Sequence, residues 1–147
     1  MQGLQEVVYV SRAVEPQTAV ALRRIVDTAR MLNRRRDLTG VLAFSGSHFL
    51  QVLEGNEARL DELLRSLRRD ARHDGLAVLS RKAVAHRRFG DWAMALVSGP
   101  ELGARFESLA SAAGAASTRA GLTQLVDSLA RHAGRCVDGA NSKFAPF

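Results

Sequence analysis

Tyr9 and Gln51 are polar residues inside short apolar segments, where an ordinary hydrophobic core has none. Gln51 lies in the stretch FLQVLEG (49–55), between Leu50 and Val52. A carboxamide has two N–H donors and an oxygen acceptor, and burying it without partners costs roughly 1 to 3 kcal/mol. Gln51 therefore needs dedicated hydrogen-bond partners, and the Tyr9 hydroxyl can donate to its oxygen.

Three further residues have side-chain types that suit a ligand site. Asn33 continues the apolar face of a helical segment, and Trp92 and Met94 are two residues apart, hence on one face of a strand. Taken alone, each has a structural explanation: Asn33 as a helix cap, and the Trp-x-Met pair as core packing. Combined with Tyr9 and Gln51, they indicate a binding site for a small molecule.

The ligand that these residues favour is flat and aromatic, because a few amides combine with a largely apolar lining. The Gln51 amide nitrogen would donate to the ligand, and Asn33 would bind its other polar edge. Arginines near the ends of the two predicted helices would hold an anionic tail. The apolar lining would come from Ile25, Leu53, Trp92 and Met94.

The first hundred residues alternate between strand and helix patterns, and these elements would position the site. Strands are predicted over 6–11, 38–44, 47–54, 76–85 and 92–98. One helix is predicted to open at Pro16 and a second after the N-cap Asn56, with Ser45-Gly46 and Asp74-Gly75 as turns. The order β-α-β-β-α-β-β predicts an α+β fold, a ferredoxin-like sheet with both helices on one face.

In this topology the first and third strands are central neighbours, and they carry Tyr9 and Gln51. Side chains alternate between the two faces of a strand. We therefore expect Tyr9 and Gln51 to face the helices together, provided that residues 7, 9 and 11 point the same way as residues 49, 51 and 53.

The composition shifts after Gly99-Pro100. Two amphipathic helices are predicted over 101–113 and 118–134. The sequence thus divides into a ligand-binding domain over 1–98 and a C-terminal helical extension over 99–147. This extension is expected to pack on the free face of the sheet or to form an oligomer contact.

The bulk composition is that of a globular domain with a substantial core, at 147 residues, 46% hydrophobic and 24% charged. The single cysteine, Cys136, excludes a disulfide framework and a cysteine-based metal site within one chain. No signal-peptide pattern and no apolar run of roughly 18 residues is present, so a cytoplasmic location away from membranes is expected. The net charge of +6 suits an anionic partner or simply keeps the protein in solution.

An enzyme on the same scaffold is one alternative. Acylphosphatases share this topology and need a glycine-rich anion loop with an arginine, which the stretch SRAVEPQ (11–17) does not supply. The phosphate-binding, dinucleotide-binding, zinc-protease and nucleophile-elbow motifs are all missing. The four histidines lack metal-ligand spacing, so neither catalysis nor a metal is expected.

Nucleic-acid binding is a second alternative, because the arginines at 34–36 and 87–88 could contact phosphates. The aromatic strand motif of RNA-reading sheets is absent. Complementation of helix dipoles explains many of the same arginines. Nucleic acid is therefore the less favoured partner.

The sequence resembles the BLUF family, the blue-light sensors that use flavin. The resemblance covers about residues 5 to 98 and is highly specific as a combination of motifs in the family's order and spacing. It implies a flavin bound non-covalently between the two helices, usually FAD, with FMN or riboflavin as alternatives, and a photoreceptor without catalytic turnover. The matching motifs are YVS (9–11), ARMLN (29–33), LTG (38–40), FLQVLEG (49–55), DARH (70–73), RRF (87–89) and WAM (92–94).

The resemblance also implies photochemical roles. Tyr9 would give an electron and a proton to the photoexcited flavin. Gln51 would rotate or tautomerise, so that a new hydrogen bond reaches the flavin carbonyl. Asn33 would hydrogen-bond the flavin ring, and Trp92 and Met94 would relay the change to the last strand.

Three more residues match family positions near the flavin: Asp70, Arg72 and His73. Leu32 and Ser66 stand where relatives often carry polar or basic flavin contacts, which leaves the choice of flavin open. The signal would pass through the C-terminal helices to a downstream protein or to the state of a homo-oligomer.

Overall fold

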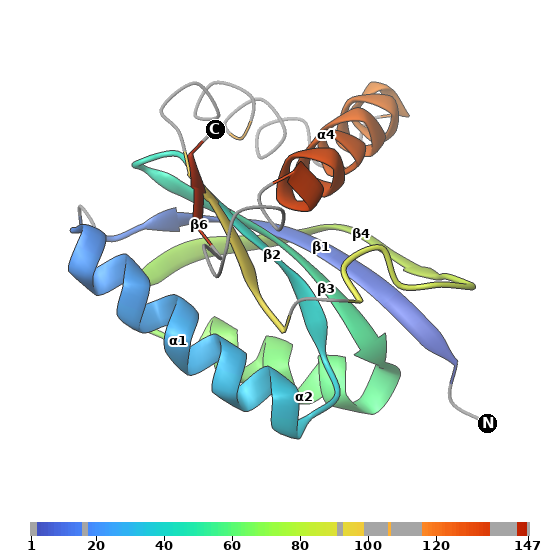
Figure 1. Cartoon of the computed structure of the whole chain (residues 1–147), viewed down its shortest axis with the longest axis horizontal. Helices are drawn as coiled ribbons and strands as arrows, with labels where there is room; N and C mark the ends of the chain where they lie inside the picture. The colour runs from blue at the N-terminus through green and yellow to red at the C-terminus, as the bar shows by residue number, and fades with distance from the viewer. Residues whose placement is uncertain are drawn as a thin grey trace.

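The fold is a mixed sheet of six strands with helices on both faces (Figure 1). The computed structural model describes residues 3–15, 18–90, 93–98, 106, 116–135 and 144–146. Apart from residue 106, the predicted helix over 101–113 lies outside these residues. The predicted site residue Trp92 lies outside them as well. The elements are β1 (Leu4–Ala13), α1 (Ala19–Arg35), β2 (Thr39–Phe44), β3 (His48–Asn56), α2 (Glu57–Arg68), β4 (His73–Ala83), β5 (Ala95–Ser98), α4 (Ala116–Arg135) and β6 (Phe144–Pro146).

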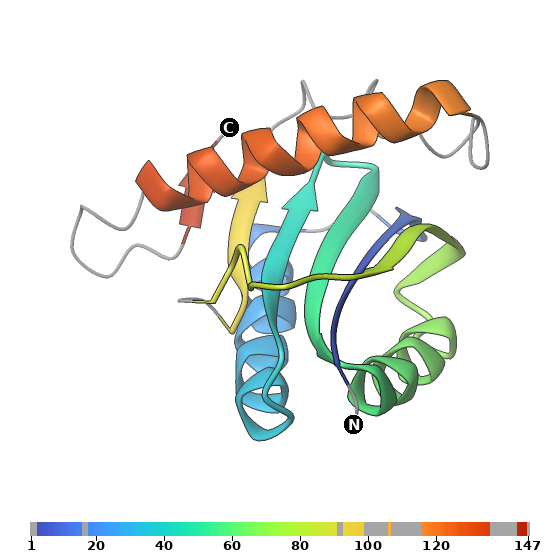
Figure 2. The same cartoon turned by 90° about the vertical axis from the view of Figure 1, so that its right-hand side faces the viewer.

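The predicted ferredoxin-like arrangement is confirmed. The strand order in the sheet is β4-β1-β3-β2-β5-β6, and β1 and β3 are antiparallel central neighbours. Helices α1 and α2 cover one face, while α4 crosses the other face (Figure 2). Strand β5 extends the sheet beyond β2 in parallel, and β6 pairs in parallel with β5.

The register between β1 and β3 confirms that the two polar residues share a face. Tyr9 lies directly opposite Gln51, and the flanking pairs are Val7 with Leu53 and residue 11 with residue 49. Directly opposed side chains in an antiparallel pair point the same way. Tyr9 and Leu53 belong to the apolar core beneath α1 and α2, so Gln51 points toward the helices as well.

Capping and periodicity explain both helices on this face. Helix α1 begins after Thr18, whose hydroxyl accepts a hydrogen bond from the Ala21 N–H at 3.0 Å. Pro16, where the sequence predicted the start, lies outside the described residues. The predicted N-cap of α2 is confirmed, since the Asn56 side chain accepts from the Ala58 N–H at 2.9 Å.

Two strands begin three residues away from the predicted position. Asp74-Gly75 is not a turn between elements, because β4 already begins at His73. Gly75 has a φ of 61° and lies at a shift in the register between β1 and β4, where a bulge needs the left-handed conformation that glycine adopts freely. Strand β5 begins only at Ala95 instead of residue 92.

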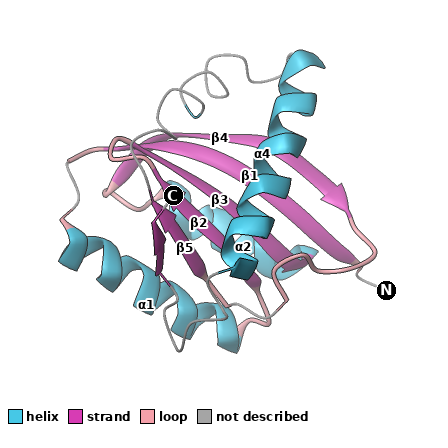
Figure 3. Cartoon of the chain, turned by 45° about the horizontal axis from the view of Figure 1, so that its top comes forward, coloured by secondary structure: helices cyan, strands magenta, loops and turns pink. Residues whose placement is uncertain are grey.

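Helix α4 packs on the sheet face opposite α1 and α2 (Figure 3). Its apolar stripe of Leu122, Leu125, Val126 and Leu129 belongs to one buried cluster with residues of the four strands β1, β2, β3 and β5. This confirms that the second predicted C-terminal helix packs on the free face of the sheet. A role for residues 99–147 in oligomer contacts or output stays a prediction. No helix within the described ranges combines the length and the apolar character that crossing a bilayer requires.

A buried carboxylate fastens the segment that follows β4. Glu54 is fully buried and accepts hydrogen bonds from the backbone N–H groups of Arg88 and Phe89, at 2.6 and 3.0 Å, and from the Thr39 hydroxyl. The Arg88 guanidinium forms an ion pair with Asp127 on α4. Arg88 therefore links the sheet to α4.

Glu6 makes stability depend on pH. It is 3% exposed, and its Oε2 has no hydrogen-bond partner in the described part of the chain. Burial raises the pKa of Glu6 above its ordinary value, against the opposing effect of Lys82 and Arg88. A carboxyl group whose pKa is raised by folding contributes stability below its unfolded pKa, and this stability is lost as pH rises through the folded pKa.

We therefore expect Glu6→Gln to raise the midpoint of urea unfolding at pH 7. The gain should shrink as the pH falls below the ordinary pKa of glutamic acid, because Glu6 is then neutral in the parent protein too. Glu62→Gln, at an exposed position, is the control and should change the midpoint little at either pH. A lower midpoint for Glu6→Gln at pH 7 would contradict this account.

Candidate functional site

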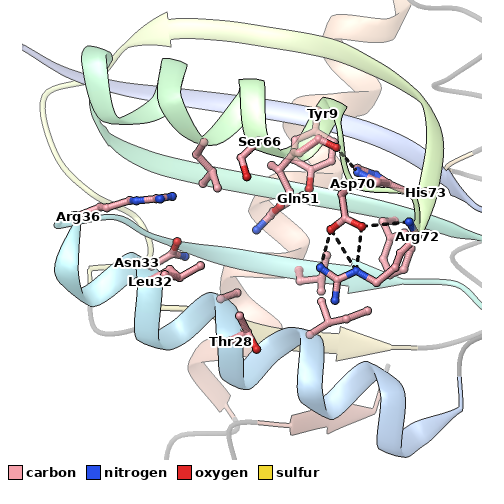
Figure 4. A pocket seen from close by; sticks show the side chains of 16 residues that line it. Tyr9, Thr28, Leu32, Asn33, Arg36, Gln51, Ser66, Asp70, Arg72 and His73 are labelled. Carbon is pink, nitrogen blue, oxygen red and sulfur yellow. Dashed lines mark hydrogen bonds and ion pairs between the residues drawn. The ribbon is translucent and has the colours of Figure 1, made fainter.

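A cavity of about 140 Å³ lies between α1, α2 and the sheet (Figure 4). Its walls come from α1, from the sheet, and from α2 with the segment after it. Helix α1 and its end contribute Ile25, Thr28, Ala29, Leu32, Asn33 and Arg36. The sheet contributes Tyr9, Leu42, Phe49 and Gln51, and α2 with the segment after it contributes Leu63, Ser66, Leu67, Asp70, Arg72 and His73.

Gln51 has the dedicated partners that its burial requires. The Tyr9 hydroxyl donates to Gln51 Oε1, and Gln51 Nε2 donates to the sulfur of Met94 over 3.6 Å. All three side chains are buried. The two ends of the amide thus face different partners, so a reversal of the amide would exchange donor and acceptor in this network without moving the backbone.

The Tyr9 hydroxyl stays protonated and able to donate. Burial raises the pKa of Tyr9, and the negative charge of Asp70 adds to the effect. Gln51 Oε1 can only accept a hydrogen bond, so the Tyr9 hydroxyl must be the donor. Any proton that leaves Tyr9 must therefore have a strong driving force.

Asn33 faces the cavity from the opposite wall (Figure 4). Its Nδ2 donates to the carbonyl of Ala93 at 2.7 Å, and its own backbone carbonyl accepts from the Leu38 N–H at 2.8 Å. An amide has a second N–H bond and an oxygen, so one hydrogen bond leaves capacity for a ligand. Asn33 and Gln51 would hold a flat molecule from two sides.

Asp70, Arg72 and His73 form a polar wall at the end of α2. The Asp70 carboxylate accepts from the Arg72 backbone N–H at 3.0 Å and from its Nε at 2.9 Å, and these bonds lower the pKa of Asp70. His73 Nε2 donates to the Leu67 carbonyl, 2.6 Å away, since a carbonyl only accepts. His73 Nδ1, at 2.7 Å from the Ser11 hydroxyl, then accepts from it when the ring is neutral.

The structure gathers most of the predicted site residues around the cavity. Seven of the eight predicted binding residues line it, and the eighth, Leu53, is fully buried in the core instead. Met94 is 1% exposed and reaches the site through Gln51. Trp92 lies outside the described residues.

The sequence reasoning missed several lining residues that helical spacing could have found. Thr28 and Ala29 lie three and four residues after Ile25 on α1, and Arg36, just after α1, lies three residues after Asn33. Leu63 and Leu67 follow the same rule on α2. Phe49, which shares the face of Gln51 on β3, also borders the cavity.

The donor set fits a flat aromatic molecule with polar edges. The amides of Asn33 and Gln51, on opposite walls, can bind the polar edges of the ring. The apolar helix residues suit its flat body, and the Arg36 guanidinium at one end suits an anionic tail. Within the described ranges, acidic and histidine side chains form no cluster that would hold a metal ion. The fold and cavity together define a class: a ferredoxin-like α+β domain for a planar organic ligand.

Comparisons with known proteins identify the family. The BLUF family model, described as sensors of blue light using FAD, matches residues 4–95. The chain belongs to the BLUF family of flavin-binding blue-light sensors.

Individual relatives agree with this assignment. The chain is 33% identical to the blue light- and temperature-regulated antirepressor BluF of Escherichia coli K12, over 63% of this chain and 23% of that protein. It is 31% identical to the photoactivated adenylate cyclase subunit beta of Euglena longa, over 63% of this chain and 11% of that protein. The chain thus spans less than a quarter of these relatives.

Solved structures show the same fold. The dark-state structure of the BLUF protein BlrB superposes with a TM-score of 0.74 at 30% identity, and covers 89% of this chain and 98% of that one. Klebsiella pneumoniae BlrP1, solved with FMN and cyclic diGMP, gives a TM-score of 0.61 at 34% identity over 65% of this chain and 26% of its own.

Proposed function

We propose that this chain is a blue-light photoreceptor that binds FAD non-covalently in the cavity between α1 and α2. The observation that carries this proposal is the hydrogen bond between Tyr9 and Gln51, which both line that cavity, together with the contact from Gln51 to Met94. A bound flavin would supply the absorption of blue light and an acceptor for one electron and one proton. FMN and riboflavin share the ring system and stay alternatives.

Tyr9 would be the donor of that electron and proton. Its hydroxyl already donates a hydrogen bond to Gln51 Oε1, and the buried site holds the donor in place. When the proton moves, the Tyr9 oxygen changes from donor to acceptor, and the amide of Gln51 no longer has its preferred partner. Gln51 would respond by rotating or tautomerising, and its changed amide would make the new hydrogen bond to the ligand.

The change would reach the rest of the fold through Met94. Rearrangement of Gln51 withdraws the N–H from the Met94 sulfur, and Met94 directly precedes β5. Strand β5 lies between β2 and β6 in the sheet, and its residues Ala95 and Val97 belong to the same buried cluster as the apolar stripe of α4. Met94, and Trp92 with it, would thus relay the light signal to the last strands.

The output would be a change in protein–protein interaction and not an enzymatic reaction. We propose that the chain signals to a downstream protein or through its own oligomeric state, and that its location is cytoplasmic. Some relatives are named as photoactivated adenylate cyclases, and that activity belongs to those proteins. Gel filtration in the dark and under blue light should show a difference in assembly, alone or with a partner; identical profiles throughout would reject this output.

An absorption spectrum of the purified protein, in the dark and just after blue light, tests the proposed function. We expect flavin bands that shift slightly to the red and return thermally in the dark. A flavin spectrum without a reversible shift would reject the photoreceptor role. A colourless protein that also fails to take up added FAD would reject the cofactor.

A further inference from the structure

The segment Ala93–Met94 is held by side chains of α1 instead of by the sheet. The ladder between β5 and β2 begins only at Ala95. The carbonyl of Ala93 accepts from Asn33 Nδ2 at 2.7 Å, and the carbonyl of Met94 accepts from Arg30 Nε at 2.9 Å. Residues 30 and 33 are neighbours on one face of a helix, so the two bonds act on consecutive peptide groups.

Arg30 is an unexpected residue for this position. It is 8% exposed and continues the buried stripe of Leu22 and Val26 on α1. Burying a guanidinium is costly unless it is paired and hydrogen-bonded. Arg30 has such partners in Asp27, at 3.4 Å, and in the Met94 carbonyl. An apolar side chain would continue the stripe without this cost, which indicates that the bond to Met94 has a use.

The contact between Gln51 and Met94 cannot hold the segment by itself. A thioether sulfur is a weak acceptor, and the Gln51 amide lies 3.6 Å from it. A hydrogen bond from a charged donor to a backbone carbonyl is stronger than one between neutral groups. The bond from Arg30 is therefore better able to fix the position of the Met94 backbone, from which the side chain extends.

We propose that Arg30 is a positioning residue of the light response, which holds the Met94 carbonyl so that the Met94 sulfur returns to the Gln51 amide after illumination. This inference rests on the proposed function. Recovery in the dark requires the sulfur and the amide to meet again. A segment without the Arg30 bond samples more positions, so the network re-forms more slowly.

Two substitutions of equal length isolate the hydrogen bond. Counted from Cα, the Nε2 of glutamine occupies the place of arginine Nε, and the terminal carbon of methionine occupies the same place without a donor. Arg30→Gln and Arg30→Met both lose the charge, and only Arg30→Gln keeps an N–H for the Met94 carbonyl. Arg34→Met is the matched control, because Arg34 lies one turn further along α1 and is exposed.

The first measurement is the rate of dark recovery after a blue flash. We expect Arg30→Met to slow recovery by about fivefold, the ratio that corresponds to one net hydrogen bond. Arg30→Gln should recover most of the parent rate, and Arg34→Met should keep it. Equal rates for Arg30→Met and Arg30→Gln, or for Arg30→Met and the parent, would overturn the role of the hydrogen bond.

The second measurement needs no light. Hydrogen–deuterium exchange of the peptide that spans residues 93–98 should be faster in Arg30→Met than in Arg30→Gln and the parent, in darkness and without flavin. If the parent shows no light-induced shift, the proposed function fails, and Arg30 then has no light response to position. Unchanged exchange in Arg30→Met, beside a parent that does shift, rejects Arg30 as the anchor while the proposed function stands.

Discussion

Gln51→Leu is expected to bind flavin and to show no light-induced red shift. The leucine side chain has about the volume of glutamine but neither the N–H nor the oxygen that connects Tyr9 to Met94. The shift requires an amide that can change its hydrogen bond to the ligand, and leucine has none to change. The shift after illumination should therefore fall below detection, while the flavin bands remain.

Flavin retention has a separate physical basis. The cavity keeps Asn33, Arg36 and its apolar walls in this variant. The substitution does leave the buried Tyr9 hydroxyl without its acceptor, at a cost of about 1 to 3 kcal/mol in the free energy of unfolding. Circular dichroism melting would measure that loss alongside the difference spectrum.

The control for this variant is Gln124→Leu. Gln124 is exposed on α4, far in sequence from the cavity, and undergoes the same chemical change. It should keep both the flavin and the full shift. A normal shift in Gln51→Leu would exclude Gln51 as the rearranging residue, and loss of flavin from Gln51→Leu alone would show that its amide is needed mainly for binding.

Gly40→Ala is expected to destabilise the fold severely. A Cβ atom at Gly40 would lie 2.0 Å from the backbone oxygen of Val52 on the neighbouring strand. The atom in the way belongs to the backbone of β3, so relief requires β2 and β3 to separate next to Gln51. Overpacking of a core costs typically 1 to 3 kcal/mol and occasionally more, and we expect about 3 kcal/mol or more here.

Two other glycines give a graded comparison in urea unfolding. A Cβ at Gly55 would meet the flexible end of Leu38 at 2.3 Å, so Gly55→Ala should cost less than Gly40→Ala. Gly121 in α4 has no atom within 4 Å of an added Cβ, and alanine there should stabilise by about 0.5 to 1 kcal/mol because glycine weakens a helix. A parent-like midpoint for Gly40→Ala would contradict the predicted clash.

Regular patterns along the chain determined the frame of the site. Strand and helix periods gave the element order, and Asn56 before an apolar helical stripe gave the start of α2. The ferredoxin-like order placed Tyr9 and Gln51 on neighbouring central strands, and the alternation of side chains allowed both to face the helices. These features depend on residues close in sequence or on a topology with few alternatives, so the sequence by itself determined them.

The contacts that complete the site depend on the tertiary structure. The bond from Arg30 to Met94 joins residues 64 positions apart, and the bond from Asn33 to Ala93 joins residues 60 positions apart. No local pattern in the sequence marks these two helix residues as donors to that segment. The same applies to Leu53, whose face was predicted but whose depth placed it in the core and not at the cavity. Periodicity assigns a side chain to a face; only the packing of whole elements decides how deep it lies and which distant backbone group it meets.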